Sequence, residues 1–239
     1  MCYTRGSMTR PLYEMFNTVP RHYDLLNKLM TLGLDKKWRN KAAQACLTHS
    51  PESVLDICCG TGDLAHTVSL VKDTNTKIYA LDYSRLMLDI AVQKTELLVD
   101  KPSLIIGDAS QLPFQDESFD CVGISFAFRN LTYRNPRISD HLAEIFRIIK
   151  SGGRFVIVES SQPKSSLIRK LFHIYLRFYV AKIGAFISGN KGAYNYLAES
   201  AMRFYKPDEI KEILMQAGFS RVDYEPLFFG AAGIQIAVK

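Results

Sequence analysis

Two glycines placed directly after a short apolar run are the residues in this chain that most clearly indicate chemistry. The run at 53–57 contains Asp56, and Gly60 and Gly62 follow it before a stretch with helical spacing begins. Glycines in a tight turn let the backbone approach a ligand because they have no Cβ, and the new helix presents its free N–H groups there. This arrangement is typical of the nucleotide-binding corner of a doubly wound α/β fold.

Charge distinguishes between the two cofactors that such a corner accepts. The residues at 60–65 fit the Gly-x-Gly-x-x-Ala fingerprint of dinucleotide binding, and Asp82 follows where a ribose-binding acid belongs, so NAD is one candidate. A pyrophosphate, however, binds bare helix N-terminal N–H groups, whereas Asp56 and Asp63 flank these glycines. Two carboxylates suit the positive sulfonium and ammonium groups of S-adenosylmethionine, which we therefore favour over NAD as the cofactor.

The other candidate cofactor residues lie where successive strands are expected to end. In parallel α/β sheets, ligands bind beyond the carboxyl ends of the strands. Asp82 can accept hydrogen bonds from both ribose hydroxyls there, each worth about 1.5–3 kcal/mol because the acceptor is charged. Asp108 and the backbone N–H of Ala109 are placed to recognise adenine, and Ser125 to line the methionine part. The complete set of expected cofactor residues is Asp56, Gly60, Thr61, Gly62, Asp82, Asp108, Ala109 and Ser125.

Alternating strands and helices must position these residues. Apolar periodicity predicts strands at 77–81, 103–106, 119–125 and 154–158, with helices at 63–71, 84–99 and 136–150. A helix at 207–217 and an antiparallel pair of strands at 222–228 and 234–238 complete the sheet. The alternation predicts a doubly wound, mostly parallel seven-stranded sheet with helices on both faces, a Rossmann-like α/β fold.

A helical segment precedes this sheet. Positions 11–50 have amphipathic helical spacing. We expect residues 1–50 to be a tail and a helical lid over the ligand crevice, and residues 51–239 to form the main domain. In the alternative interpretation, the helices of this segment only cover the core. His22 precedes Tyr23 and titrates near neutral pH, which makes it a candidate base.

An inserted helical cap is expected at about 164–203, before the last helix of the domain. Within its part at 164–191, Lys170, His173 and Arg177 share one helical face, and Phe and Tyr residues surround them. A basic amphipathic helix rich in aromatic residues can lie in the interface of an anionic membrane. The alternative is a cap helix with a solvated basic edge, and one helix can do both.

Composition excludes several classes of protein. The chain has 239 residues with 30 Lys and Arg against 24 Asp and Glu, a mild excess that selects no partner. Its five cysteines have no C-x-x-C spacing, so we expect reduced thiols, a cytoplasmic protein and no metal site. No apolar run reaches the ~18 residues of a membrane span. Nucleic acid is not an expected partner, because no base-amine motif is present and the cap contains the single aromatic-rich basic stretch.

Several motifs together resemble a known family. Leu-Asp-Tyr-Ser at 81–84 and Gly-Asp-Ala at 107–109, placed after the glycine corner, are similar to motifs of class I S-adenosylmethionine-dependent methyltransferases. Four further stretches resemble the ubiquinone and menaquinone biosynthesis C-methyltransferases of the UbiE/MenG family, and these stretches lie at 23–39, 124–132, 159–163 and 194–200. The resemblance extends from about residue 15 to residue 239.

The resemblance implies methylation of a ring carbon of a polyprenylated quinol, demethylmenaquinol or the equivalent ubiquinol precursor. Peripheral association with the inner face of the membrane and a homodimer are further expectations. Another phenolic or sterol-like acceptor is the alternative within methyltransferases. Outside that class, the alternatives are an NAD-dependent oxidoreductase and a non-enzymatic binding module. By position, the resemblance implies cofactor contacts at Thr61, Asp82, Asp108, Ala109 and Ser125.

The candidate catalytic residues follow from the chemistry of such a quinol. A ring carbon becomes nucleophilic when a neighbouring hydroxyl loses its proton, and a phenol titrates near pH ~10. Arg129 stays charged and can stabilise the developing oxyanion, while water or His22 takes the proton. Asn130 and Tyr23 are expected to orient the ring. The alternative for Arg129 is an ion pair with an acid on a helix.

Overall fold

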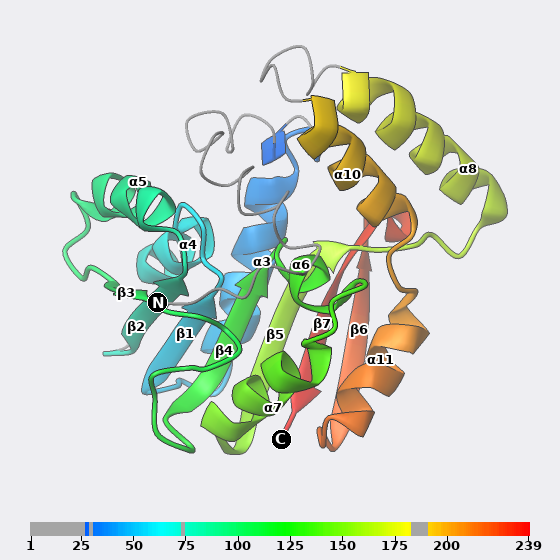
Figure 1. Ribbon diagram of the computed structural model, residues 1–239. Helices are drawn as coiled ribbons and strands as arrows, with labels where there is room; N and C mark the ends of the chain where they lie inside the picture. The colour runs from blue at the N-terminus through cyan, green and yellow to red at the C-terminus, as the bar shows by residue number, and fades with distance from the viewer. Residues whose placement is uncertain (1–26, 29–30, 73–74, 183–190) are drawn as a thin grey trace.

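A seven-stranded sheet forms the centre of the protein (Figure 1). The computed structural model describes residues 27–28, 31–72, 75–182 and 191–239. The strands lie in the order β3-β2-β1-β4-β5-β7-β6; β1 to β5 pair in parallel, and β7 runs antiparallel between β5 and β6. The doubly wound fold predicted from the sequence is thereby confirmed. The strands are β1 Ser53–Ile57, β2 Lys77–Asp82, β3 Ser103–Ile106, β4 Phe119–Ser125, β5 Ile149–Ser160, β6 Arg221–Leu227 and β7 Ala232–Val238.

Helices cover both faces of the sheet because its central strands are apolar on both sides. Val54, Leu55 and Ile57 of β1 are at most 1% exposed, as expected of a parallel strand between two helical layers. One core cluster joins the sheet to α3 and α4, and a second joins it to α6, α7 and α11. The bounds of these helices and of α5 are α3 Asp35–Leu47, α4 Asp63–Val71, α5 Arg85–Thr95, α6 Phe128–Thr132, α7 Ile138–Ile148 and α11 Pro207–Gln216.

Several element boundaries differ from those expected. The helix expected at 84–99 ends at Thr95, although Ser84 caps it as predicted by accepting a hydrogen bond from the Met87 N–H at 3.4 Å. The helix expected at 136–150 is shorter at both ends, and the short helix α6 lies where no helix was expected. β5 begins five residues before the expected strand, because the glycine turn at 151–153 is a bulge inside it where the pairing register with β4 shifts.

The described part of the N-terminal segment covers the core. Trp38, Ala42 and Cys46 of α3 are buried against the sheet and α4. Residues 1–26, which include Tyr23 and His22, lie outside the described residues, so the lid stays a prediction. The division of the chain at residue 50 also stays a prediction.

In the described residues, the inserted cap contains α8 Ser166–Ile174, a π-helical turn at Tyr175–Val180 and α10 Lys191–Met202. The amphipathic helix expected within 164–191 is present, and it is interrupted by the π-helical turn at Tyr175–Val180. Gln162 ties the cap to β5, because its Nε2 donates to the Ala201 carbonyl at 2.8 Å and its Oε1 lies 3.0 Å from His173 Nε2. In Figure 1 the cap lies above the edge of the sheet at which β5 ends. No helix in the described ranges is long and apolar enough to cross a membrane.

Candidate active site

The turn between β1 and α4 has the geometry that its glycines predict. Gly60 and Gly62 have positive φ values of 55° and 78°, which residues with a Cβ rarely adopt. Gly62 is also the N-cap of α4, and a Cβ added to it would lie 2.9 Å from the Cβ of Ala91 on α5. Both the turn and the close packing of α4 on α5 therefore require glycine at this position.

Asp82 holds this turn against the end of β2. Its Oδ2 accepts a hydrogen bond from the Gly60 N–H and its Oδ1 accepts one from the Ser84 N–H, both at 2.8 Å. Burial raises the pKa of Asp82, and the backbone hydrogen bonds oppose that shift. Each carboxylate oxygen keeps a second lone pair, so Asp82 can hold the turn and accept ribose hydroxyls at the same time.

Asp56 does not carry the charge that the sequence suggests. Its Oδ2 accepts a hydrogen bond from the Ala65 N–H at 2.9 Å, whereas its Oδ1 is buried and has no hydrogen-bond partner in the described part of the chain. Burial raises the pKa of Asp56 to about 8. Near neutral pH the Asp56 carboxyl is therefore mostly protonated, so the sequence-based argument that counted it as a full negative charge is corrected.

Two cations that the sequence analysis did not assign to the site lie at the same corner. Lys94 Nζ of α5 lies 2.6 Å from Asp63 Oδ1 and donates to Thr61 Oγ1 at 2.8 Å. Arg39 of α3 reaches the other oxygen of Asp63 at 3.3 Å, and its Nε donates to Ser125 Oγ at 3.2 Å. Helix packing alone brings these cations here. Arg39 lies in a family-like stretch of sequence, but Lys94 has no such signal.

Asp108 lies in the loop after β3 and is partly exposed. Its Oδ1 accepts hydrogen bonds from the Ser110 N–H at 2.9 Å and the Ser110 hydroxyl at 2.6 Å, and its Oδ2 lies 3.6 Å from Arg137 Nη1. Burial acts to raise the pKa of Asp108, but the Ser110 hydrogen bonds and the Arg137 charge outweigh it and lower that pKa. Asp108 is therefore an ionised acceptor, and Ala109 beside it is buried.

Arg129 on α6 is buried in an ion pair. Its Nη1 lies 3.1 Å from Glu159 Oε1 and donates to Ser160 Oγ at 2.7 Å, and its backbone N–H donates to Glu159 Oε2 at 3.1 Å. The acid expected as an alternative partner is thus present, but it ends strand β5 instead of belonging to a helix. Because 124–132 and 159–163 are both family-like stretches, this pair joins two of them.

Unsatisfied polar atoms remain beside this pair. Arg129 Nε and Asn130 Oδ1 are both buried. Neither atom has a hydrogen-bond partner among the described residues. Tyr196 on α10 lies close enough for the Arg129 charge to act on its phenol: burial raises the pKa of Tyr196, and the guanidinium opposes that shift. The third family-like stretch, at 194–200, therefore also reaches Arg129. The expected position of Tyr23 lies outside the described residues.

The predicted residues gather along one edge of the sheet. Asp56, Asp82 and Ser125 lie at or near the carboxyl ends of β1, β2 and β4, and Arg129 lies just beyond the end of β4 on α6. Their contacts with a cofactor or substrate stay predictions. Within the described ranges, no three His, Cys, Asp or Glu side chains are grouped to hold a metal ion.

Solved structures with this fold include S-adenosylmethionine-dependent methyltransferases. A possible histamine N-methyltransferase from Thermotoga maritima, described as S-adenosylmethionine-dependent, has a TM-score of 0.61 and 21% identity, covering 97% of this chain and 100% of its own. Human N-acetylserotonin methyltransferase, solved with S-adenosylmethionine, has a TM-score of 0.67 and 14% identity, covering 98% of this chain and 60% of its own. The protein therefore has the Rossmann-like fold of S-adenosylmethionine-dependent methyltransferases.

Sequence comparison identifies the family. Residues 5–239 match the ubiE/COQ5 methyltransferase family, and the chain belongs to it. The demethylmenaquinone methyltransferase of Deinococcus radiodurans is 39% identical over 226 residues, covering 95% of this chain and 91% of its own length. The enzyme of that name from Thermotoga maritima is 38% identical over 232 residues, covering 97% of both chains. Membership of this family supports S-adenosyl-L-methionine as the cofactor.

Proposed function

We propose that this enzyme transfers a methyl group from S-adenosylmethionine to a ring carbon of a polyprenylated quinol, converting demethylmenaquinol to menaquinol or methylating the equivalent ubiquinol precursor. The observation that carries the proposal is the buried Arg129–Glu159 pair. It joins two stretches that the general methyltransferase fold does not need, and Tyr196 of a third stretch lies near it. The names of the similar bacterial enzymes support the same reaction.

The residues present fit the cofactor. When bound, S-adenosylmethionine supplies an activated methyl group. Asp82 offers lone pairs for the ribose, and the ionised Asp108 offers an acceptor for the exocyclic amine of adenine. The Oδ1 of Asp56 is buried and has no hydrogen-bond partner in the described part of the chain, so a polar group of the cofactor would satisfy it. Thr61 and Ser125 would line the methionine part.

Arg129 and its neighbours would act on the quinol. A phenol with a pKa near ~10 is mostly protonated at neutral pH, so a fixed positive charge beside it favours the oxyanion that activates the ring. Glu159 and Ser160 hold Nη1 of the guanidinium, so that the group keeps one orientation. Arg129 Nε is a donor and Asn130 Oδ1 an acceptor, and a quinol hydroxyl satisfies both types of group. Water or His22 would take the proton.

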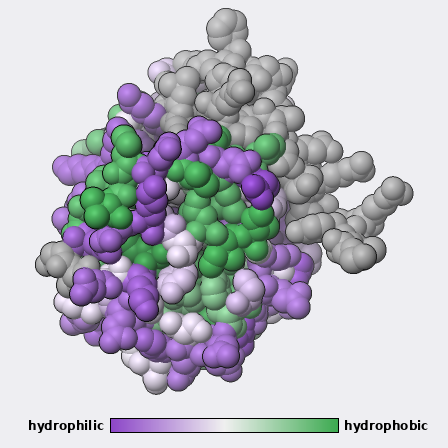
Figure 2. All heavy atoms as spheres, turned by 90° about the vertical axis from the view of Figure 1, so that its left-hand side faces the viewer, coloured by the Kyte–Doolittle hydropathy of each residue, from purple (hydrophilic) through white to green (hydrophobic). Residues whose placement is uncertain are grey.

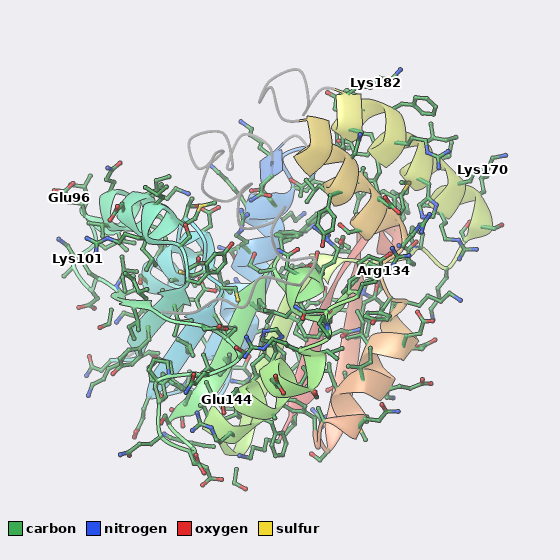
Figure 3. All side chains as sticks on the ribbon, viewed as in Figure 1. Glu96, Lys101, Arg134, Glu144, Lys170 and Lys182 are labelled. Atoms are coloured by element: carbon green, nitrogen blue, oxygen red, sulfur yellow. The ribbon has the colours of Figure 1, made fainter. Side chains whose placement is uncertain are left out.

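The cap also supports contact with a membrane, where a polyprenylated substrate resides. Residues spaced four, three and four apart along α8 and the π-helical turn are exposed, and these are Leu167, Leu171, Ile174 and Phe178. The opposite side packs on α10 through Leu176 and Val180. Figure 3 shows Lys170 and Lys182 on the outside of the cap. We infer that this apolar stripe, with its basic neighbours, lies on the inner face of an anionic membrane; a homodimer stays an expectation.

Mass spectrometry tests the reaction. Chemically reduced, detergent-dispersed demethylmenaquinol is incubated with the protein and methyl-labelled S-adenosylmethionine. We expect one labelled methyl group on the ring, and the Arg129→Ala variant, matched for S-adenosylhomocysteine binding, to transfer far less. If no label reaches demethylmenaquinol while S-adenosylhomocysteine still raises the melting temperature, demethylmenaquinol is the wrong acceptor. Benzoquinols and other phenols are then tested.

A further inference from the structure

The amino-acid end of S-adenosylmethionine carries a carboxylate, and the predicted cofactor residues provide no cation for it. Their side chains are acids, hydroxyls, a methyl group and glycine hydrogens. Asp82 and Asp108 of this set are assigned to the ribose and the adenine, and a carboxylate held near these acids without a positive partner would be costly to desolvate. A residue outside the predicted set must therefore balance it.

Arg39 of α3 is placed at the methionine end of the site. The residue is 5% exposed, and its Nε donates to the hydroxyl of Ser125, which is expected to line the methionine part. Nη1 lies 2.5 Å from Asp35 and 3.3 Å from Asp63, and the guanidinium stacks 5.5 Å from the centroid of the Phe126 ring. These contacts fix the plane of the group through Nε and Nη1. Across the described residues, no hydrogen bond of Nη2 is found.

We propose that Arg39 binds the carboxylate of the methionine part of the cofactor. A guanidinium presents parallel N–H donors that match a carboxylate, and here two acids orient it in advance. Lys94 is the competing cation. It is bonded to Thr61 and Asp63, and its side chain is 25% exposed, so solvent screens its charge more than that of Arg39. The inference rests on the cofactor and is independent of the quinol.

Two ligands that differ only by the carboxylate test this role of Arg39, and the test needs no methyl transfer. Calorimetry would compare S-adenosylhomocysteine with its decarboxylated analogue, which keeps the amine. Arg39→Gln should weaken binding of S-adenosylhomocysteine about tenfold or more, while the decarboxylated analogue changes less than about twofold. If both ligands lose the same factor, or if S-adenosylhomocysteine loses none, the proposal is overturned.

Two further variants separate a binding role from a structural one. Asp35→Asn breaks the ion pair between Asp35 and Arg39 but keeps the guanidinium. This variant should therefore still prefer S-adenosylhomocysteine over the decarboxylated analogue. Loss of that preference in Asp35→Asn would contradict the assignment. If Arg39→Gln fails to fold, Arg39→Lys replaces it in the test, because this variant keeps a cation. It should show a smaller loss of affinity, confined to S-adenosylhomocysteine. A Lys94→Met variant that alone abolishes the preference would assign the carboxylate to Lys94 instead.

Discussion

Arg129 Nη1 lies 3.1 Å from Glu159 Oε1, and the two side chains are 4% and 3% exposed. Removing two charges from water is costly, and the pair is stable only because further hydrogen bonds satisfy it. Glu159 Oε1 also accepts from the Ser160 N–H and hydroxyl at 2.8 Å, and its Oε2 accepts from the Arg129 N–H. The acid is therefore more completely satisfied than the guanidinium, whose Nε is left for another acceptor.

This asymmetry predicts different effects for the two partners. Glu159→Gln leaves the buried Arg129 charge uncompensated, and we expect the free energy of unfolding to fall by about 3–5 kcal/mol, measured by urea denaturation. Arg129→Lys retains a charge but loses the planar fork, so turnover should fall while the affinity for S-adenosylhomocysteine changes little. A parallel loss of turnover and cofactor affinity in Arg129→Lys would mean that the residue is structural.

Replacement of Asp82 should weaken recognition of the ribose selectively. Asp82→Ala removes the acceptor of the ribose hydroxyls, and S-adenosylhomocysteine should bind about tenfold more weakly or worse. The same change should cost a 2′-deoxy analogue less, because that ligand already lacks one hydroxyl. Calorimetry on both ligands checks this. The control variant is Asp89→Ala, at an exposed position of α5, and it should bind both ligands as the wild type does. Equal losses for the two ligands would show that Asp82 acts only by holding the Gly60 turn.

Local patterns explain what the sequence predicted well. The Ser84 cap and the hydrogen bond from the Ser84 N–H to Asp82 join residues within a few positions of each other, and the strands are apolar runs that alternate with helices. Long-range packing explains what it missed. Arg39 and Ser125 are 86 positions apart, and Arg129 meets Glu159 across 30 positions. The loss of charge on Asp56 follows from complete burial, which no local pattern reports.

Asp56 makes stability depend on pH. Its pKa of about 8 in the folded protein exceeds the ~3.9 of an unfolded chain. Between these values the folded state holds a proton that the unfolded chain has lost. The free energy of unfolding therefore falls as pH rises, by at most about 1.4 kcal/mol per pH unit from this group, and the fall ends once pH passes the folded pKa.

Urea denaturation of the wild type and Asp56→Asn between pH 5 and 9 measures this contribution. Asparagine does not ionise, so the difference in free energy between the two proteins should shift in favour of the variant as pH rises toward about 8. Histidines and other groups titrate in both proteins and cancel in that difference. A difference that is constant across the range would show that Asp56 is already ionised in the folded protein.

The apolar stripe on the cap predicts binding to vesicles. Leu171 and Phe178, two members of the stripe, are 58% and 54% exposed. Burying a side chain of this size is worth ~1.5–3 kcal/mol, so Leu171→Ser with Phe178→Ser should weaken sedimentation with phosphatidylglycerol vesicles by at least about tenfold. Lys170→Glu with Arg177→Glu should weaken it most at low salt, because screening reduces the contribution of exposed charges.

A matched control distinguishes this surface from exposed apolar residues in general. Leu86 and Leu97, in and just after α5, are 47% and 96% exposed. α5 lies at the left of Figure 1, on the side that Figure 2 turns toward the viewer. Leu86→Ser with Leu97→Ser removes comparable apolar area away from the cap, so it should sediment as the wild type does. If both double variants lose binding equally, attachment is non-specific; if neither does, the cap helix does not contact the membrane, and the prenyl chain must reach the site from solution.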